Sequence, residues 1–362
     1  MLLSGFFFYT NYYQISSTIK SRKLTSGFGY CPKVKKIAFL KVHKAGSTSV
    51  SNILQRFALH NDLNLLLPDK NQTSKRFMFH VIGRDYSQTI PAPRGQHYDI
   101  LCNHVVYNRE QFKNWFDPDT KYIAIVRDPV DRFLSAAYYY GVLSKNKVNE
   151  HGIETESLQL ENYLLERARN GSNTADPLNQ AVDFGVHPRN QTKSFMSNYL
   201  DIIKDDFSLV LIMEYFDESL VLMRRLFCWE LQDIIYLKLN INKRHLSLTL
   251  TEDSIKLLKY LQSAEQMIYE LFLDRFWQQM LHEGPGVFDE VQHLKNVLSR
   301  ISRYCYLGVF SSDLVVETSE WNNIFSISAD DCRMMMSPEI AMNKELIARQ
   351  WQKYYKSLKK KI

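Results

Sequence analysis

The feature that most constrains this chain is a strand, a tight turn and a helix within its first sixty residues. Residues 34–42 are predicted to form a buried strand, and residues 44–48 turn the chain into a helix. The helix carries apolar residues three and four positions apart, the spacing of a buried helical face. These residues are Val50, Ile53, Leu54 and Phe57. Strand, short turn and helix form the unit from which phosphate sites are built, so this segment favours an α/β fold with an anion site.

The turn itself has the chemistry of a phosphate site. Free backbone N–H groups at a helix N-terminus face outward, and the helix dipole favours an anion there. Lys44 adds a positive charge, and hydroxyl donors follow it. The predicted cradle consists of Lys41, Lys44, Ala45, Gly46, Ser47, Thr48 and Ser49. A capped helix beside a solvated lysine is the simpler alternative for this segment taken alone.

The turn does not match the loop of nucleoside triphosphate kinases. That loop, GxxxxGK[ST], places its lysine directly before the hydroxyl residue. Here Ala45 and Gly46 separate Lys44 from Ser47. The spacing therefore disfavours a kinase.

A second phosphate-binding segment is predicted at residues 125–139. Arg127 follows a short apolar strand, and Pro129 stands where a helix would begin. Ser135 lies about two helical turns further on, so the arginine and the hydroxyl are predicted to reach one phosphate from neighbouring faces. A plain helix start at Asp128 and Pro129 is the alternative.

Alternating strands and helices predict a parallel α/β sheet flanked by helices. Further strands are expected at residues 98–106, 122–126, 207–213 and 234–239. Further helices are expected at residues 108–116 and 216–226, and the chain from residue 252 is predicted to be helical over 252–280, 288–303 and 338–358. The pattern predicts an N-terminal segment at 1–30, a main domain at 31–285 and a helical C-terminal extension at 286–362 that packs on it.

Composition excludes several classes of protein. The 362 residues are 45% hydrophobic, which is enough for a full core, and the net charge of +6 suits an anionic ligand but is too dilute for a nucleic-acid binder. Five cysteines without CxxC pairs predict no zinc site and no metal. Cys305 and Cys332 bracket a polar stretch, so a bridge between them is expected in an oxidising compartment, and the odd count leaves a thiol free.

The first residues and the glycosylation triplets bear on the compartment. Residues 1–9 are apolar, but the run is far shorter than the roughly 20 residues that span a bilayer. The tail of a signal anchor and an ordinary apolar strand are both open readings. Asn-x-Ser/Thr triplets begin at Asn71, Asn170 and Asn190, and they favour the secretory pathway.

The two phosphate segments together resemble those of sulfotransferases that use 3′-phosphoadenosine 5′-phosphosulfate (PAPS), with the 5′-phosphosulfate segment first and the 3′-phosphate segment second. Residues 101–104, 207–222, 226–229, 236–240 and 337–340 extend this resemblance to the galactose-3-O-sulfotransferase family, which includes galactosylceramide sulfotransferase. The resemblance spans roughly residues 30–350. Ala45 departs from the family's usual threonine, a change that a backbone cradle tolerates.

The resemblance implies a sulfotransferase fold, PAPS as donor and a galactose hydroxyl, O3, of a glycolipid or glycoprotein glycan as acceptor. It also implies a type II Golgi membrane enzyme with a lumenal catalytic domain, although the N-terminus lacks a full anchor. A PAPS enzyme for another glycan, such as a uronic acid, and a non-catalytic glycan-binding protein of the same fold are the alternatives.

Catalytic roles are assigned by chemistry. Lys44 is predicted to stabilise the leaving group, and His104, at the end of a strand, to accept the hydroxyl proton. His43 is the rival base, ranked second because strand alternation would turn it away from Lys44. Lys243 and Arg244 are candidates for the 3′-phosphate or adenine side of the donor. Minor candidates are Glu214 for orientation and Tyr138, Tyr139 and Tyr140 for stacking on a sugar.

Overall fold

The computed structural model describes residues 31–69, 89–143, 148–149, 152–153, 155–170, 179–187, 190–238 and 250–359. The predictions made for residues 1–30, Asn71, Lys243 and Arg244 lie outside these ranges. Within them, no helix combines the length and the apolar character needed to cross a membrane.

A four-stranded sheet of order β2-β1-β3-β6 lies at the centre, and every neighbouring pair is parallel. Ile37 on β1 lies opposite Ile100 on β2 and Lys121 on β3, while Ile123 on β3 lies opposite Leu209 on β6. The strands are β1 (Ile37–Leu40), β2 (Ile100–Leu101), β3 (Lys121–Val126) and β6 (Leu209–Ile212). Nearly all their side chains are buried on both faces, as expected for parallel strands covered by helices. The predicted α/β class is confirmed.

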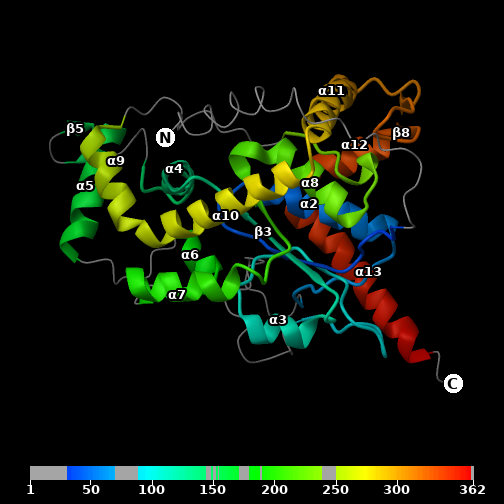
Figure 1. The fold of residues 1–362 in the computed structure, drawn as a ribbon. Coiled ribbons are helices and arrows are strands. Elements are labelled where there is room, and N and C mark those ends of the chain that lie inside the picture. Colours follow the sequence, from blue (N-terminus) through cyan, green and yellow to red (C-terminus); the bar gives the residue numbers. More distant parts are fainter. Residues whose placement is uncertain are drawn as a thin grey trace.

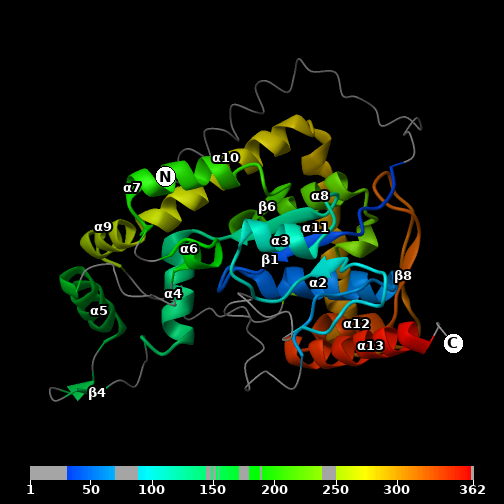
Figure 2. The same cartoon turned by 90° about the horizontal axis from the view of Figure 1, so that it is seen from below.

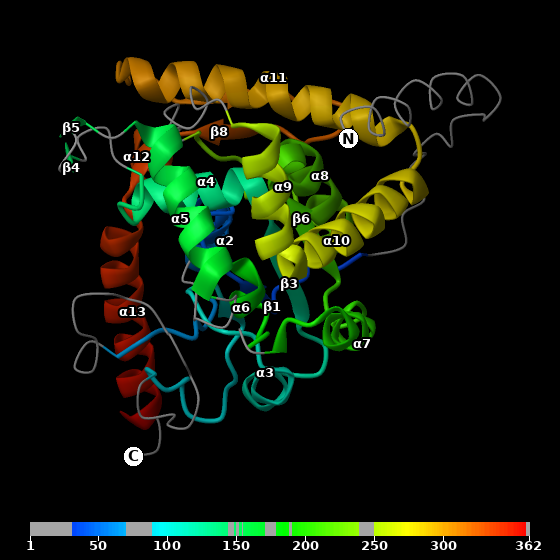
Figure 3. The ribbon, with the colours of Figure 1, turned by 90° about the vertical axis from the view of Figure 1, so that its left-hand side faces the viewer.

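Helices cover both faces of this sheet (Figures 1 and 3). α2, α8 and α12 lie on one side, and α3, α6 and α7 lie on the other. The helices before the middle of the chain are α2 (Ser47–His60), α3 (Arg109–Trp115), α4 (Pro129–Tyr139), α5 (Glu156–Asn170), α6 (Gln180–Asp183) and α7 (Lys193–Ile203). The later ones are α8 (Phe216–Phe227), α9 (Glu252–Leu261), α10 (Ser263–His282), α11 (Gly286–Leu307), α12 (Ala329–Met336) and α13 (Glu339–Lys359). Asn108 caps α3 and Asp128 caps α4 with their side chains, which fixes where these helices begin.

Short elements complete the fold. Two antiparallel pairs, β4 (Val148–Asn149) with β5 (Gly152–Ile153) and β7 (Leu314–Val316) with β8 (Phe325–Ile327), stand apart from the central sheet. Single 3-10 turns occur at η4 (Met213–Tyr215) and η5 (Leu231–Asp233).

The strand predicted at residues 234–239 is wrong: 234–238 have no regular structure and pair with no strand of the sheet, and residue 239 lies outside the described ranges. Ile234, Ile235 and Tyr236 are buried, which explains the apolar pattern. Their backbone and side chains are held by other partners, since Arg56 donates to the Ile235 carbonyl and the Tyr236 hydroxyl donates to Asp217. Burial alone does not distinguish a strand from a packed irregular segment.

The helix predicted over residues 252–280 is two helices, with Gln262 at the break. The change of direction lets α9 pack against α4 and α5, while α10 packs along β6 (Figure 2). A second, smaller apolar cluster forms where α4, α5 and α9 meet. Arg132 on α4 also pairs with Glu265 on α10 through two 2.8 Å hydrogen bonds, and both side chains are fully buried. α4 is therefore anchored on both sides.

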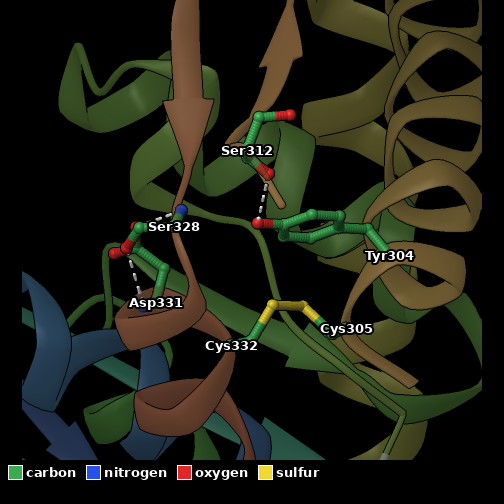
Figure 4. Close-up of a disulfide and its surroundings, with 6 residues drawn as sticks. All are labelled: Tyr304, Cys305, Ser312, Ser328, Asp331 and Cys332. Carbon is green, nitrogen blue, oxygen red and sulfur yellow. Dashed lines mark hydrogen bonds between the residues drawn. A yellow bond between two sulfur atoms is a disulfide. The ribbon is translucent and has the colours of Figure 1, made fainter. Parts of the chain in front are cut away.

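The C-terminal region packs into the same core as the sheet. Figures 1 and 2 both place α12 and α13 beside α2, and Leu346 and Ile347 of α13 belong to the main apolar cluster. The predicted bridge between Cys305 and Cys332 is present and ties α11 to α12 (Figure 4). A second disulfide joins Cys31 to Cys228, 197 residues apart, and the sequence pattern did not predict it.

Candidate functional site

The candidate site lies at the carboxyl edge of the parallel sheet. The order β2-β1-β3-β6 means that the chain leaves β1 toward one side and continues on the other side at β3. In open α/β sheets, ligands bind at such a switch point, outside the carboxyl ends of the strands. Both predicted phosphate segments begin here, one after β1 and one after β3.

The turn between β1 and α2 packs closely against Met213 and presents backbone N–H groups at the start of the helix. Lys44 and Gly46 both have positive φ, 61° and 75°. The positive φ favours glycine at position 46, and a Cβ added there would lie 2.2 Å from the Met213 sulfur, so that flexible side chain would have to shift. No described side chain caps α2; the Ser49 N–H donates to the Gly46 carbonyl at 3.2 Å, and the N–H groups that precede it have no partner within the helix. The turn thus has the form of an anion cradle.

The three hydroxyls that follow the turn are not equivalent. The Ser47 hydroxyl donates to the Val42 carbonyl at 2.7 Å and is buried, so its hydrogen is used within the turn. Thr48 is exposed and Ser49 is partly buried. Ala45 is fully buried and can offer an anion only its backbone.

The Lys44 side chain reaches from the first predicted phosphate segment to the second. Its ammonium lies 3.9 Å from the centre of the Tyr139 ring, at the last residue of α4. The Arg127 guanidinium lies 3.5 Å from the Lys44 carbonyl oxygen. Burial, and to a lesser extent the charge of Arg127, lower the pKa of the Lys44 ammonium. Two cations held near one another favour the binding of an anion.

The second turn is fixed by carboxylates. Asp128 accepts from the N–H groups of Val130 and Asp131 and so caps α4. The Asp128 N–H donates in turn to Glu214, at 3.0 Å, and the Tyr269 hydroxyl donates to the other oxygen of Glu214. Burial raises the pKa of the Glu214 carboxyl. Glu214 therefore holds the backbone beside Arg127.

Ser135 lies within α4 and is partly buried. It precedes Tyr139 by four residues, so the hydroxyl and the ring share one face of the helix. The arrangement places Ser135 on the side of α4 that carries the ring under Lys44.

Lys41 is not placed like the other cradle residues. Its side chain is 1% exposed, and its ammonium forms an ion pair with Glu339, the first residue of α13. Its charge is therefore already neutralised, whereas its backbone carbonyl accepts a hydrogen bond from His104 Nδ1 at 2.8 Å.

The two histidines lie together. The rings of His43 and His104 stack with centres 3.9 Å apart and planes 15° apart. His43 Nδ1 lies 2.7 Å from Asp183 Oδ1, and the His43 N–H donates to Asp183 Oδ2 at 2.9 Å. Strand alternation does not separate the rings, because His43 stands beyond the end of β1.

Sequence reasoning missed the contribution of α6. Asp183 contacts His43, and Gln180 Nε2 donates to the Arg127 carbonyl at 3.2 Å. Neither residue belongs to a recognisable motif, and α6 is only four residues long. A search for acidic residues that partner the two histidines would have had many equivalent candidates.

Among the described residues, no group of three or more histidines, cysteines or carboxylates is arranged to hold a metal ion.

The parallel sheet, with a strand–turn–helix unit on each side of its switch point, defines an α/β protein. A family model described as galactose-3-O-sulfotransferase matches residues 6–315. The chain belongs to the galactose-3-O-sulfotransferase family, and its fold is the sulfotransferase fold.

Individual relatives are similar at a moderate level of identity. The chain is 29% identical to galactose-3-O-sulfotransferase 3 of Mus musculus over 279 residues, which cover 75% of this chain and 63% of that protein. It is 27% identical to galactosylceramide sulfotransferase of Bos taurus over 347 residues, which cover 89% and 80%. It is 28% identical to galactose-3-O-sulfotransferase 2 of Mus musculus over 285 residues, which cover 76% and 70%. The chain thus spans under two thirds of the length of galactose-3-O-sulfotransferase 3.

Proposed function

We propose that this protein transfers a sulfuryl group from PAPS to O3 of a terminal galactose on a glycolipid or glycoprotein glycan. The observation that carries the proposal is that Lys44, Arg127 and His104 follow the carboxyl ends of β1, β3 and β2, three adjacent strands. Family membership supplies the reaction class, and the relatives' names supply galactose and galactosylceramide.

The donor fits the residues that are present. The Gly46 turn admits an anion against its backbone, and Lys44 and Arg127 supply positive charge on either side. In the proposal, Lys44 to Ser49 bind the 5′-phosphosulfate, while Arg127 and Ser135 bind the 3′-phosphate. The role of Arg244 beside the 3′-phosphate is proposed from the sequence alone. Lys41 supports the cradle through its backbone.

In the proposed sulfuryl transfer, one bond to sulfur forms as another breaks, and one proton moves. The acceptor oxygen forms a bond to sulfur as the bond from sulfur to the donor's phosphate oxygen breaks, and the electron pair leaves with that oxygen. Lys44 stabilises the charge that develops there. The acceptor proton passes to His104 Nε2, because Nδ1 of the neutral ring carries a hydrogen donated to the Lys41 carbonyl. The products are the sulfated galactoside and 3′-phosphoadenosine 5′-phosphate.

The proposed setting is the lumen of the Golgi, with the enzyme attached to the membrane. Two disulfides, Cys31–Cys228 and Cys305–Cys332, support an oxidising compartment. Asn190, one of the candidate glycosylation sites, is exposed. The proposed boundary between a main domain at 31–285 and an extension at 286–362 rests on the sequence. In the fold, residues of both parts belong to one apolar cluster.

The deciding experiment incubates the protein with PAPS and each of galactosylceramide, lactosylceramide and N-acetyllactosamine, followed by mass spectrometry. Addition of one sulfate to a galactoside supports the proposal, and fragmentation locates it at O3 or elsewhere. Transfer to heparan-type acceptors instead would indicate a uronic acid enzyme. Binding of 3′-phosphoadenosine 5′-phosphate without transfer to any acceptor would indicate a glycan-binding protein and would overturn the proposal.

A lysine substitution tests the mechanism. Lys44→Met is expected to lower kcat by about 10²–10³-fold, the usual loss when one charge-stabilising donor is removed. Lys36→Met is the matched control, since Lys36 pairs with Asp117 and Asp119 and lies just before β1, at the opposite edge of the sheet. It should leave kcat unchanged. A Lys44→Met variant with the turnover of the wild type would remove Lys44 from the mechanism.

A further inference from the structure

α6 connects the two turns that form the site. Gln180 at its start donates to the Arg127 carbonyl, and Asp183 at its end binds His43. The side chain of Asn179 caps α6 by accepting from the Ala181 N–H at 2.8 Å. A helix of only one turn has little stability by itself, so these contacts both hold α6 and are held by it.

Asp183 fixes the orientation and the tautomer of His43. One carboxylate oxygen accepts from the His43 backbone N–H at 2.9 Å, and the other lies 2.7 Å from the ring nitrogen Nδ1. A carboxylate accepts hydrogen bonds only, so Nδ1 carries the hydrogen and Nε2 keeps its lone pair when the ring is neutral. The Asp183 side chain is 7% exposed, so water competes little for these bonds.

His43 in turn restrains His104. The Lys41 carbonyl accepts from His104 Nδ1 at one edge of the ring. The face of His43, 3.9 Å away and nearly parallel, packs against one side of the ring and limits its rotation toward that side. Edge and face contacts together define the direction in which His104 Nε2 points.

His43 itself is poorly placed to take the acceptor proton. Its Nε2 is buried and has no hydrogen-bond partner among the residues that the structure describes. A buried lone pair without a partner costs free energy, and such costs are tolerated where the ring's position matters. What matters for the stack on His104 is therefore the position of the His43 ring.

We infer that Asp183 is a positioning residue for sulfuryl transfer: through His43 it holds the ring of His104 in the orientation that accepts the acceptor proton. This inference rests on the proposed function and extends it to α6, which no motif covers. Asp183 and His43 need not touch the donor, the acceptor or the reacting atoms. Their effect is on the rate of the chemical step and not on binding.

Asp183→Asn tests the inference. An amide can present its NH₂ group to His43 Nδ1, which would favour the other tautomer and turn the ring; in the Ser-His-Asp triad the same change costs about 10⁴-fold in kcat. Because Asp183 acts at one remove, the expected loss in kcat is on the order of 10²-fold, the cost of a displacement of about 1 Å. The KM values for PAPS and galactoside should change less than about threefold, since uniform binding is untouched.

Asp206→Asn is the matched control. Asp206 is buried to a similar degree, with 8% of its side chain exposed, and it accepts from the Tyr107 hydroxyl at 2.7 Å and Arg109 at 2.8 Å. It precedes β6, at the amino end of that strand, and its side chain bonds Tyr107 and Arg109 instead of a histidine. The two variants should lose similar free energies of unfolding, but Asp206→Asn should keep the kcat of the wild type.

A double-mutant cycle distinguishes positioning from general damage. If Asp183 acts through His104, adding Asp183→Asn to His104→Ala should lower kcat by less than about threefold further, because the group it positions is already gone. Full additivity of the two losses would overturn the inference, as would wild-type kcat in folded Asp183→Asn. An inactive wild type would instead overturn the proposed function, so the two failures are distinguishable.

Discussion

Gly46→Ala is the substitution that most directly tests the shape of the cradle. The new Cβ would lie 2.2 Å from the Met213 sulfur and 2.9 Å from its methyl carbon. These atoms are the end of a flexible side chain, so their displacement should cost no more than about 1 kcal/mol. The positive φ of 75° adds roughly 1–2 kcal/mol for any residue with a Cβ. The free energy of unfolding should therefore fall by about 1–3 kcal/mol in urea titrations.

Met213→Ala separates the two contributions. It removes the atoms that the new Cβ would meet, so the difference between Met213→Ala and the double variant should shrink to the φ cost of roughly 1–2 kcal/mol. Calorimetric titration with 3′-phosphoadenosine 5′-phosphate should show at least tenfold weaker binding for Gly46→Ala, because the amides of the turn are displaced. Unfolding and nucleotide binding that both match the wild type would show that the turn is not a tight cradle.

Three further predictions concern groups outside the reaction. Burial raises the pKa of Glu214 above the ordinary value of 4.5, so the folded state binds the proton more strongly and stability falls as pH rises through this window. The free energy of unfolding of Glu214→Gln, measured by urea titration, should therefore rise relative to that of the wild type between about pH 4 and pH 8. A difference between the two proteins that does not change with pH would contradict this. Cys102 is buried, and burial raises the pKa of its thiol to about 12, so a thiol reagent should modify one cysteine of the unreduced protein only after unfolding. The double variant Cys305→Ser, Cys332→Ser should have a free energy of unfolding about 2–4 kcal/mol lower than the wild type. An unchanged urea midpoint would show that the disulfide does not contribute to stability.

The sequence predicted the two strand–turn–helix units because their signals are local. Around Gly46, a buried strand, a glycine turn and a helix with an apolar stripe follow one another directly in the sequence. In the second unit, Asp128 and Pro129 mark the start of α4. Such patterns are set by backbone sterics and by the period of the helix, and both act between neighbours in the chain. The Cys305–Cys332 bridge was also within reach, since only 27 residues separate the two cysteines.

The segment at residues 234–238 shows where local signals mislead. Its apolar run predicted a strand, but Tyr236 donates to Asp217 and Arg56 donates to the Ile235 carbonyl, so the backbone is satisfied without a partner strand. Whether an apolar run joins a sheet depends on which edge is free beside it, and the run itself does not carry that information.

The sequence by itself determined the parallel α/β sheet and the two strand–turn–helix units, and it supplied the charged residues that the proposal places at the site. Only the tertiary structure decided how those residues are used. Lys41 was predicted for the donor, yet Glu339, 298 residues away, takes its ammonium, and Asp183, 140 residues from His43, fixes the ring that stacks on His104. The physical reason is that a single carboxylate has no period or spacing to reveal its partner. Its role is set by which chain segments the core brings together, and that is a property of the folded whole.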